Sequence, residues 1–516
     1  MRHIPRSPSR STAGPRAVGV VVVVVVLSLL GAACTADEGE IDAGPKMVAA
    51  TASDVFQLPT DSRFEPGPCP INPTTRVDVA IQCGTLRVPE KRDQPDGNQV
   101  DLAVMILRST SDDPSPDPIV YLEGGPGGSA LVNLQRWIDP VTPLLDQRDV
   151  ILLDQRGTGF SSPSLACDEE FEDASLFSTS AEVLGECIAR LDEAGVDRSA
   201  YTTFENAADL KDLREALGLE SWNLYGVSYG TRLALETMRR HGEHIEFVIL
   251  DSVYPPEVGG LDWAEAISLE AVPRVISGCL EEASCGAQFP GLEQNLVDAM
   301  AMLDAEPFLA ETNDSQGTNH QLQLSGADMY AGLFNALYDP SVIPMVPLLI
   351  AIAGNGNFNF LNLVADGALP GLIGLSEGAR YSMDCSDWGT LAIPAAGALE
   401  ASLAAHPELS TLYVGHSVPF CAAWDVEPAP PEFLEGVVSD LPTLVLAGEF
   451  DPVTPVAQSQ QTASRLSQSA FYVFPGLGHG PSYNTDCAAT MVRDFLVAGA
   501  VVDDGCWAAI PTTTFP

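Results

Sequence analysis

The segment Gly226-Val227-Ser228-Tyr229-Gly230 is the clearest indication of the fold. It follows the apolar run 222–225 and precedes residues 231–236, which read as the start of a helix. A short apolar run that ends in a glycine turn is typical of a strand buried on both faces of a sheet. A serine between two glycines at such a strand-to-helix turn forms a nucleophile elbow, which lifts its hydroxyl clear of the sheet. We therefore predict that Ser228 is a nucleophile, and the helix N-terminus favours the negative charge that develops beside it.

The same pattern, a short apolar run that ends in a glycine-rich or polar turn, recurs along the chain. It indicates an α/β fold with a mainly parallel sheet flanked by helices. Residues 78–86 and 100–107 flank Pro95-Asp96-Gly97-Asn98 and predict an antiparallel hairpin that opens the sheet. Residues 207–218 predict a helix, because leucines recur at helical spacing before Gly218. The other predicted strands are 119–122, 150–153, 247–250, 443–447 and 471–474.

A serine nucleophile needs a base and an acid, and both are predicted after the last two strands. His479 lies in a glycine-rich loop that follows residues 471–474, and Asp451 follows residues 443–447. The acid holds the base in one tautomer and stabilises its imidazolium form. The order Ser228, Asp451, His479 is the order expected of α/β-hydrolases. Asp251 and Asp154 also follow strands and remain alternative acids.

The tetrahedral oxyanion of acyl transfer needs two donors. The backbone N–H of Tyr229, next to the nucleophile, is predicted as the first. The second is assigned to the stretch Gly124-Gly125-Pro126-Gly127-Gly128-Ser129, which follows the early strand 119–122. Glycines leave main-chain N–H groups open to a substrate carbonyl, so Gly125 is preferred and Gly124 is the alternative.

Between about residues 255 and 440 the strand rhythm stops, and the sequence predicts a mostly helical lid inserted into the α/β core. The core is then divided into residues 63–254 and 441–516, the second part carrying the acid and the base. The apolar run 343–352 is the one candidate for a lipase-like stripe on the lid, although core packing is the commoner cause of such a run.

Charge and composition narrow the possible partners. The chain has 516 residues, 46% of them hydrophobic, and 25 basic against 70 acidic residues give a net charge of −45. A nucleic-acid binder needs clustered basic residues to contact phosphates, so no nucleic-acid partner is expected. Membrane contact through a polybasic patch is excluded in the same way. The predicted chemistry needs no cofactor and no metal.

The N-terminus reads as an export signal. Arginines precede an apolar run that ends near Ala33, which together are typical of a signal peptide over residues 1–33. The sequence Leu30-Gly31-Ala32-Ala33-Cys34 resembles a bacterial lipobox, so Cys34 is a candidate lipidation site. Residues 34–62 then form a tether. We expect an exported protein held at the outer face of the cytoplasmic membrane by a lipid. An ordinary cleaved signal, giving a secreted protein, and an uncleaved anchor stay open.

Cysteines agree with export, since disulfides form in oxidising compartments. The chain has 11 cysteines, and setting the lipidation candidate Cys34 aside leaves ten, an even number. Sequence alone leaves the connectivity open, and a zinc site is disfavoured because no C-x-x-C occurs and histidines number 7. Pairing of neighbours would give 69–83, 167–187, 279–285, 385–421 and 487–506.

Five motifs carry a family resemblance. They are Gly124-Gly125-Pro126-Gly127-Gly128-Ser129, Asp154-Gln155-Arg156-Gly157-Thr158-Gly159-Phe160-Ser161, Gly226-Val227-Ser228-Tyr229-Gly230, Asp451-Pro452-Val453-Thr454-Pro455 and Gly478-His479. From about residue 65 onward the chain resembles the tripeptidyl-aminopeptidase-like (TAP-like) serine hydrolases of actinobacteria, relatives of the prolyl iminopeptidases. The resemblance implies an α/β-hydrolase core with a lid, secretion or lipid anchoring, and hydrolysis of peptides or ester-like substrates.

One residue departs from the prolyl iminopeptidase pattern, because Glu123 stands where those enzymes have His. Proline specificity is therefore not implied. Glu123 is either a carboxylate for a substrate ammonium or a structural residue. Exopeptidases of this kind bind the free amino terminus through acidic groups, and the lid offers Glu270, Glu281, Glu282 and Asp384 without a means to choose among them.

The sequence thus predicts an exported serine hydrolase that releases short peptides from N-termini through an acyl-enzyme. A carboxylesterase or lipase with the same triad is the alternative, because amides and esters share this chemistry. A third possibility is an envelope lipoprotein that kept the fold only for binding. The sequence does not define the oligomeric state.

Overall fold

The computed structural model describes most of the chain after residue 60. The predicted signal peptide, Cys34 and all but the last two residues of the tether lie outside the described residues. None of the described helices is both long and apolar enough to cross a bilayer. The described residues are 61–71, 79–134, 138, 141–167, 181–259, 261–313, 319–365, 375–388, 398–406, 417–500, 504–511 and 514–515.

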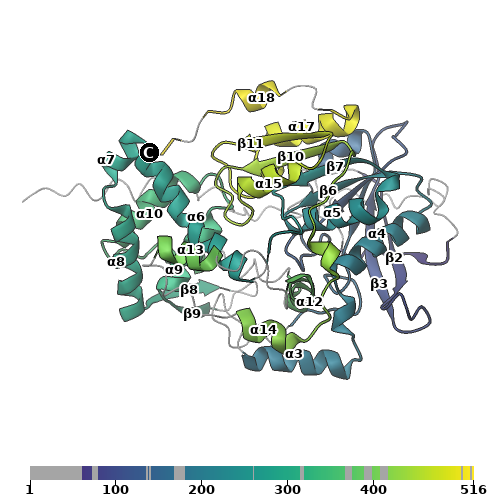
Figure 1. Ribbon diagram of the computed structural model, residues 1–516, viewed down its shortest axis with the longest axis horizontal. Helices are drawn as coiled ribbons and strands as arrows, with labels where there is room; N and C mark the ends of the chain where they lie inside the picture. Colours follow the sequence, from purple (N-terminus) through teal and green to yellow (C-terminus); the bar gives the residue numbers. More distant parts are fainter. Residues whose placement is uncertain are drawn as a thin grey trace, which may run out of the picture. The chain divides into compact units, whose positions relative to one another are not determined.

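The described residues form a nine-stranded sheet in the order β1-β2-β3-β5-β4-β6-β7-β10-β11 (Figure 1). Pairing is antiparallel from β1 to β5 and parallel from β5 to β11. The opening hairpin and the buried strands agree with the sequence pattern, and the parallel half brings the ends of β4, β6, β10 and β11 to one edge. The strands are β1 (Phe64–Gly67), β2 (Ile81–Pro89), β3 (Gln99–Leu107), β4 (Ile119–Leu122), β5 (Val150–Leu153), β6 (Trp222–Val227), β7 (Ile245–Asp251), β10 (Thr443–Gly448) and β11 (Ser469–Phe474).

Successive side chains of the central strands enter two different hydrophobic cores, one on each face of the sheet. In β4, Val120 and Leu122 lie in one core and Ile119 and Tyr121 in the other, and each core also contains residues of flanking helices. This period of two explains why the central strands are continuous apolar runs. The helices around the sheet are α3 (Ala181–Glu193), α4 (Thr203–Ala216), α5 (Tyr229–His241), α15 (Val456–Ala463), α16 (Pro481–Asn484), α17 (Asp486–Ala498) and α18 (Gly505–Ala508).

Helix α4 and helix α5 pack on the first face and α17 on the second. Helix α4 matches the helix expected at 207–218 but begins earlier, because the Thr202 side chain accepts a hydrogen bond from the Glu205 N–H and caps it. The helix ends before Gly218, whose φ of 67° is the left-handed conformation that favours glycine.

The chain between β7 and β10 contains helices with a hydrophobic core of their own, joined by Phe450 and Phe515. Ile343, Val346 and Ile350 are fully buried in that core, so the apolar run 343–352 is explained by packing. Helix α12 instead packs with the first face of the sheet. The helices of this insertion are α6 (Leu261–Glu281), α7 (Ala283–Gln288), α8 (Leu292–Ala305), α9 (Gly326–Ala336), α10 (Val346–Ala353), α12 (Glu377–Trp388), α13 (Ala398–Ala405) and α14 (Ser417–Trp424).

One element of the insertion was not predicted from the sequence. Strands β8 (Phe308–Asn313) and β9 (Asn319–Leu324) pair as an antiparallel hairpin within the mostly helical insertion. The alternation is visible in β8, since Leu309 and Glu311 are exposed while Ala310 and Thr312 are buried. Each strand has six residues, too few for the pattern to stand out among helices.

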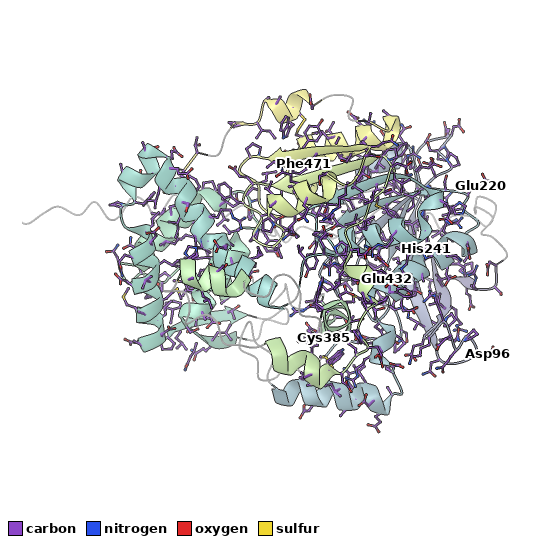
Figure 2. All side chains as sticks on the ribbon, in the orientation of Figure 1. Asp96, Glu220, His241, Cys385, Glu432 and Phe471 are labelled. Carbon is purple, nitrogen blue, oxygen red and sulfur yellow. A yellow bond between two sulfur atoms is a disulfide. The ribbon has the colours of Figure 1, made fainter. Side chains whose placement is uncertain are left out.

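In the described part of the chain, five disulfides join cysteines that are neighbours in sequence, which is one of the connectivities that the sequence left open. Cys385 of α12 is bonded to Cys421 of α14, which closes the longest of the loops (Figure 2). The other bonds are Cys69–Cys83, Cys167–Cys187, Cys279–Cys285 and Cys487–Cys506.

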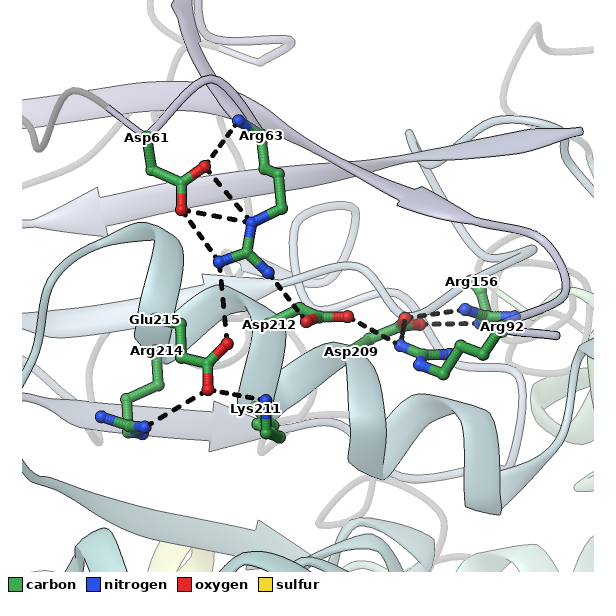
Figure 3. A network of polar contacts seen from close by, with 9 residues as sticks. All are labelled: Asp61, Arg63, Arg92, Arg156, Asp209, Lys211, Asp212, Arg214 and Glu215. Carbon is green, nitrogen blue, oxygen red and sulfur yellow. Dashed lines mark hydrogen bonds and ion pairs between the residues drawn. The ribbon is translucent and has the colours of Figure 1, made fainter. Parts of the chain in front are cut away.

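A network of ion pairs ties α4 to the first strands and to the loop after β5 (Figure 3). Arg156 is fully buried and forms two hydrogen bonds of 2.7 Å with the carboxylate of Asp209. Arg92 pairs with the same carboxylate at 2.6 Å, and Arg63 pairs with Asp212 at 2.9 Å. Buried arginines keep their charge, so a buried carboxylate with two such partners fixes this part of the core.

Candidate active site

The predicted nucleophile lies at a tight turn between β6 and α5. Ser228 has φ 57° and ψ −127°, an unusual conformation for a residue other than glycine. The flanking glycines are required by close packing: a Cβ on Gly226 would lie 2.4 Å from the Gly230 carbonyl oxygen, and one on Gly230 would lie 2.0 Å from that of Leu122. All of β6 is buried, whereas Ser228 itself is partly exposed. The serine is therefore less enclosed than the strand that leads to it.

The predicted acid and base meet at the carboxyl ends of neighbouring parallel strands. Asp451 follows β10 and His479 follows β11. The His479 Nδ1 atom lies 2.8 Å from Asp451 Oδ2, and the two side chains are 9% and 0% exposed. Thr454 donates to the same carboxylate from its N–H at 2.8 Å and from its hydroxyl at 2.7 Å.

These contacts decide the protonation of the pair. Burial opposes ionisation of Asp451, but the charge and hydrogen bond of His479 and the donors of Thr454 outweigh it, so its pKa lies below the usual value. An ionised Asp451 accepts a proton-bearing Nδ1, which leaves Nε2 of a neutral His479 as the basic nitrogen.

The two alternative acids, Asp251 and Asp154, accept hydrogen bonds from serine residues. Asp251 accepts hydrogen bonds from the Ser482 N–H, at 2.9 Å, and from the Ser482 hydroxyl. Burial raises the pKa of Asp251 to about 6. Asp154 accepts from Ser129. Of these three carboxylates, Asp451 is the one with a hydrogen bond to His479 among the described contacts.

The loop of residues 124–129, called the glycine-rich loop below, lies against the elbow. A Cβ on Gly124 would lie 3.0 Å from the Ser228 Cβ and 3.5 Å from its hydroxyl oxygen. Within the described part of the chain, neither the Gly124 nor the Gly125 N–H donates a backbone hydrogen bond. Tyr229 is the first residue of α5, where N–H groups have no intrahelical acceptor. Both predicted donors and the alternative Gly124 are thus available to an oxyanion.

Helix α12 covers the glycine-rich loop, which the sequence did not indicate. The Ser376 N–H donates to the Gly127 carbonyl at 2.8 Å, and a Cβ on Gly127 would lie 3.2 Å from the Arg380 Cβ. Arg380 forms an ion pair of 3.7 Å with Asp384, whose pKa is raised by burial.

The acidic residues that are candidates for binding a substrate amino terminus lie in different surroundings. Asp384 is the one carried by α12. Glu270 lies 3.4 Å from His406, Glu281 is exposed, and Glu282 accepts the Phe515 N–H at 2.8 Å. Glu123, directly before the glycine-rich loop, is buried, with 6% of its surface exposed.

Sequence reasoning missed residues of the insertion that contact the acid and the base. Tyr338 places its ring 5.1 Å from the His479 imidazole, centroid to centroid. Arg274 of α6 donates to the Asp451 main-chain carbonyl at 2.9 Å. Thr454, by contrast, lies within the motif Asp451–Pro455. Its hydroxyl could have been recognised from the sequence as a hydrogen-bond donor to Asp451.

Comparison with known proteins shows which families and enzymes this chain is similar to. Residues 117–275 match the family described as alpha/beta hydrolase fold, and residues 408–506 match the family described as TAP-like protein. Serine protease Hip1 of Mycobacterium tuberculosis is 24% identical over 472 residues, covering 84% of this chain and 88% of its own. Carboxylesterase B of the same species is 27% identical over 474 residues, covering 83% and 86%. A probable proline iminopeptidase of Streptomyces coelicolor is 32% identical over 161 residues, covering 31% and 38%.

A mostly parallel sheet, a serine at a nucleophile elbow and these matches define a serine hydrolase of the α/β-hydrolase fold. Within that class, the chain carries an alpha/beta hydrolase region and a TAP-like region, and it is homologous to the Hip1 serine protease and to proline iminopeptidases.

Proposed function

We propose that this chain is an exported serine peptidase that releases short peptides from the N-termini of its substrates. Ser228 is the nucleophile, His479 the base and Asp451 the acid. The observation that carries the proposal is the 2.8 Å contact between His479 Nδ1 and Asp451 Oδ2, at the sheet edge where β6 delivers Ser228. Serine protease and proline iminopeptidase relatives support a peptide substrate.

The proposed reaction follows the acyl-enzyme route. His479 Nε2 takes the proton of the Ser228 hydroxyl as its oxygen attacks the scissile carbonyl. The N–H groups of Gly125 and Tyr229 stabilise the oxyanion, usually the largest single contribution in such sites. His479 then protonates the leaving amine, activates water and releases the acid product. Asp451 stays ionised throughout and holds the imidazolium.

The proposal also covers the cellular location of the enzyme and the role of each part of the chain. Residues 1–33 direct export, Cys34 carries a lipid at the outer face of the membrane, and residues 34–62 tether the catalytic unit. Residues 63–254 and 441–516 form the core, and residues 255–440 act as the lid that shapes the substrate site. Replacing Cys34 with Ala, followed by fractionation of cells fed a labelled fatty acid, tests this: loss of both label and membrane retention is expected, and retention without label contradicts it.

A carboxylesterase is the second candidate, because Carboxylesterase B is 27% identical over most of the chain. The two candidates share the triad and differ in the bond that is cleaved. A free amino terminus matters to the first and not to the second.

One experiment separates them. The mature protein, Ser228→Ala and a control Ser382→Ala are treated with a fluorophosphonate probe, then with peptidyl anilides with free or blocked N-termini and with short esters. Ser382 is a buried serine of α12, and its hydroxyl oxygen accepts a hydrogen bond from the Trp424 indole N–H. Labelling lost only in Ser228→Ala, with cleavage only of free N-termini, is the expected result. Ester cleavage alone transfers the assignment to an esterase. Folded wild-type protein without labelling would refute a catalytic serine.

A further inference from the structure

The motif Asp154–Ser161 has no part in the reaction just described, yet it lies directly beside the site. It follows β5, and β5 pairs in parallel with β4, whose end continues into the glycine-rich loop. The two loops therefore leave the same edge of the sheet as neighbours. The carboxylate of Asp154 is fully buried between them.

Asp154 holds the far end of the glycine-rich loop. Its Oδ1 accepts the Ser129 hydroxyl at 2.8 Å and the Leu131 N–H at 3.0 Å, and its Oδ2 accepts the Phe160 N–H at 2.9 Å. Gly159 must be a glycine for this contact, since a Cβ there would lie 2.2 Å from both Asp154 Oδ2 and the Ser129 hydroxyl. One buried carboxylate thus joins the two loops through several donors.

Gln155 holds the near end. Its side-chain Nε2 donates to the Glu123 carbonyl at 3.0 Å, and the next carbonyl, that of Gly124, accepts the Gly128 N–H at 3.2 Å. In a planar trans peptide the C=O of one residue points away from the N–H of the next. These two bonds therefore set the directions of the Gly124 and Gly125 N–H groups, the candidate oxyanion donors.

The motif is itself fixed to the core. Arg156 forms its two bonds with Asp209, and the Ser161 hydroxyl donates to the Asp154 carbonyl at 2.7 Å while accepting the Ala103 N–H at 3.0 Å. Because these bonds fix the motif to the core, the motif can hold the glycine-rich loop in one orientation. Oxyanion donors contribute most when they are already oriented before the reaction.

We propose that Asp154 and Gln155 are positioning residues, which orient the N–H donors of the glycine-rich loop toward the oxyanion formed at Ser228. The inference rests on the proposed function and deepens it. Neither side chain touches the substrate, and both act through the loop. Their loss should weaken binding of the transition state and leave binding of the substrate nearly unchanged.

The test compares wild type with Asp154→Asn and Gln155→Met. Asn keeps the shape but offers one acceptor oxygen, and Met keeps the length but removes the donor. Asp117→Asn is the matched control, because Asp117 is also a buried carboxylate, paired with Arg148 and accepting Asn223 Nδ2 at 3.0 Å, but it precedes β4 at its opposite end. Four quantities are measured: kcat, KM, the inhibition constant of a peptidyl boronate that forms a tetrahedral adduct with serine, and the thermal unfolding midpoint.

Each test variant is expected to lose kcat by about tenfold or more, with KM within about twofold, and boronate affinity should fall in proportion to kcat/KM. The pH profile of kcat/KM should keep its wild-type shape in Gln155→Met, because that substitution neither adds nor removes a titratable group. The control should keep kcat and boronate affinity even where its unfolding midpoint drops. Unchanged kcat in folded Gln155→Met, or a changed pH profile in that variant, would overturn the inference. Wild-type protein without fluorophosphonate labelling would instead refute the proposed function.

Discussion

The ring of Tyr338 lies edge-on to the imidazole of His479, with 5.1 Å between ring centroids and 65° between ring planes. Tyr338 follows α9 in the insertion, whereas His479 follows the last strand of the sheet. The packing is close, since a Cβ on Gly478 would lie 1.8 Å from the Leu337 carbonyl oxygen. The insertion also reaches the acid through Arg274. Both partners of the hydrogen-bonded pair are therefore supported from outside the α/β core.

Replacing Tyr338 with Ala should lower kcat by roughly two- to tenfold, because an aromatic pair is worth about 0.5–1.5 kcal/mol beyond its buried area. Tyr338→Phe keeps the ring and should stay near wild type. Steady-state kinetics with the best substrate of the peptide panel measures both. Equal losses in the two variants would mean that the hydroxyl, and not the ring contact, matters.

The two buried carboxylates near His479 should differ sharply in their effect on activity. Asp451→Asn removes the acceptor that fixes the His479 tautomer and should lower kcat by about four orders of magnitude. Asp251→Asn changes a contact with Ser482 and should cost only a few-fold. Rates are compared under saturating substrate, with folding checked by circular dichroism. A larger loss in Asp251→Asn would make Asp251 the acid.

Asp251 should also make stability depend on pH. Burial raises its pKa to about 6, above the value near 3.9 in an unfolded chain. Between these values the folded state holds a proton that the unfolded state has released, so the free energy of unfolding falls as pH rises through this window. A shift of this size corresponds to about 2–3 kcal/mol at most.

Asp251→Asn should therefore lose less stability than wild type between pH 4 and pH 7. Urea unfolding at several pH values gives the two curves, and their difference cancels the many other carboxylates. Asp451 has the opposite sign, because its pKa is lowered, and its contribution is lost only as pH falls below about 4. Parallel curves for Asp251→Asn and wild type would refute the expected proton uptake.

The disulfides should contribute according to the loops that they close. Cys385–Cys421 spans 36 residues and Cys279–Cys285 spans 6. Loop entropy predicts about 4 kcal/mol for the first and about 2 kcal/mol for the second. Double Cys→Ala variants of each pair, compared by denaturant unfolding, should show the larger loss for the pair that joins α12 to α14. A reversed order would show that packing outweighs loop length.

The central strands β4, β5, β6 and β10 could be predicted from the sequence because each is a fully buried run that ends in glycine or a polar turn. Strand β1 was not predicted, because it has no apolar run and only its first residue is buried. The elbow could be read for a related reason: Gly226 and Gly230 are required by backbone contacts that any such turn repeats. Asp451 and His479 follow from their places after β10 and β11, since parallel strands bring their ends to one edge. Their roles stay predictions until the variants above are measured.

The contacts of the insertion could not be read in this way. Tyr338 is one of 11 tyrosines, and nothing local distinguishes it from a surface residue. Its position against His479 results from how helices with a separate core dock near the strand ends. The placement of α12 over the glycine-rich loop depends on hydrogen bonds such as Ser376 to Gly127, which join residues far apart in the chain. Periodicity reports which face of a helix is buried and not which partner covers it.

The backbone at Ser228 has a further consequence for how this position can evolve. A φ of 57° with ψ of −127° costs a residue with a side chain about 1–3 kcal/mol, and glycine adopts it with far less strain. If Ser228 is the nucleophile as proposed, a Ser228→Gly chain should be inactive and yet more stable than its parent. Drift toward stability alone would thus remove the hydroxyl, so a serine in this conformation persists only while its chemistry is under selection.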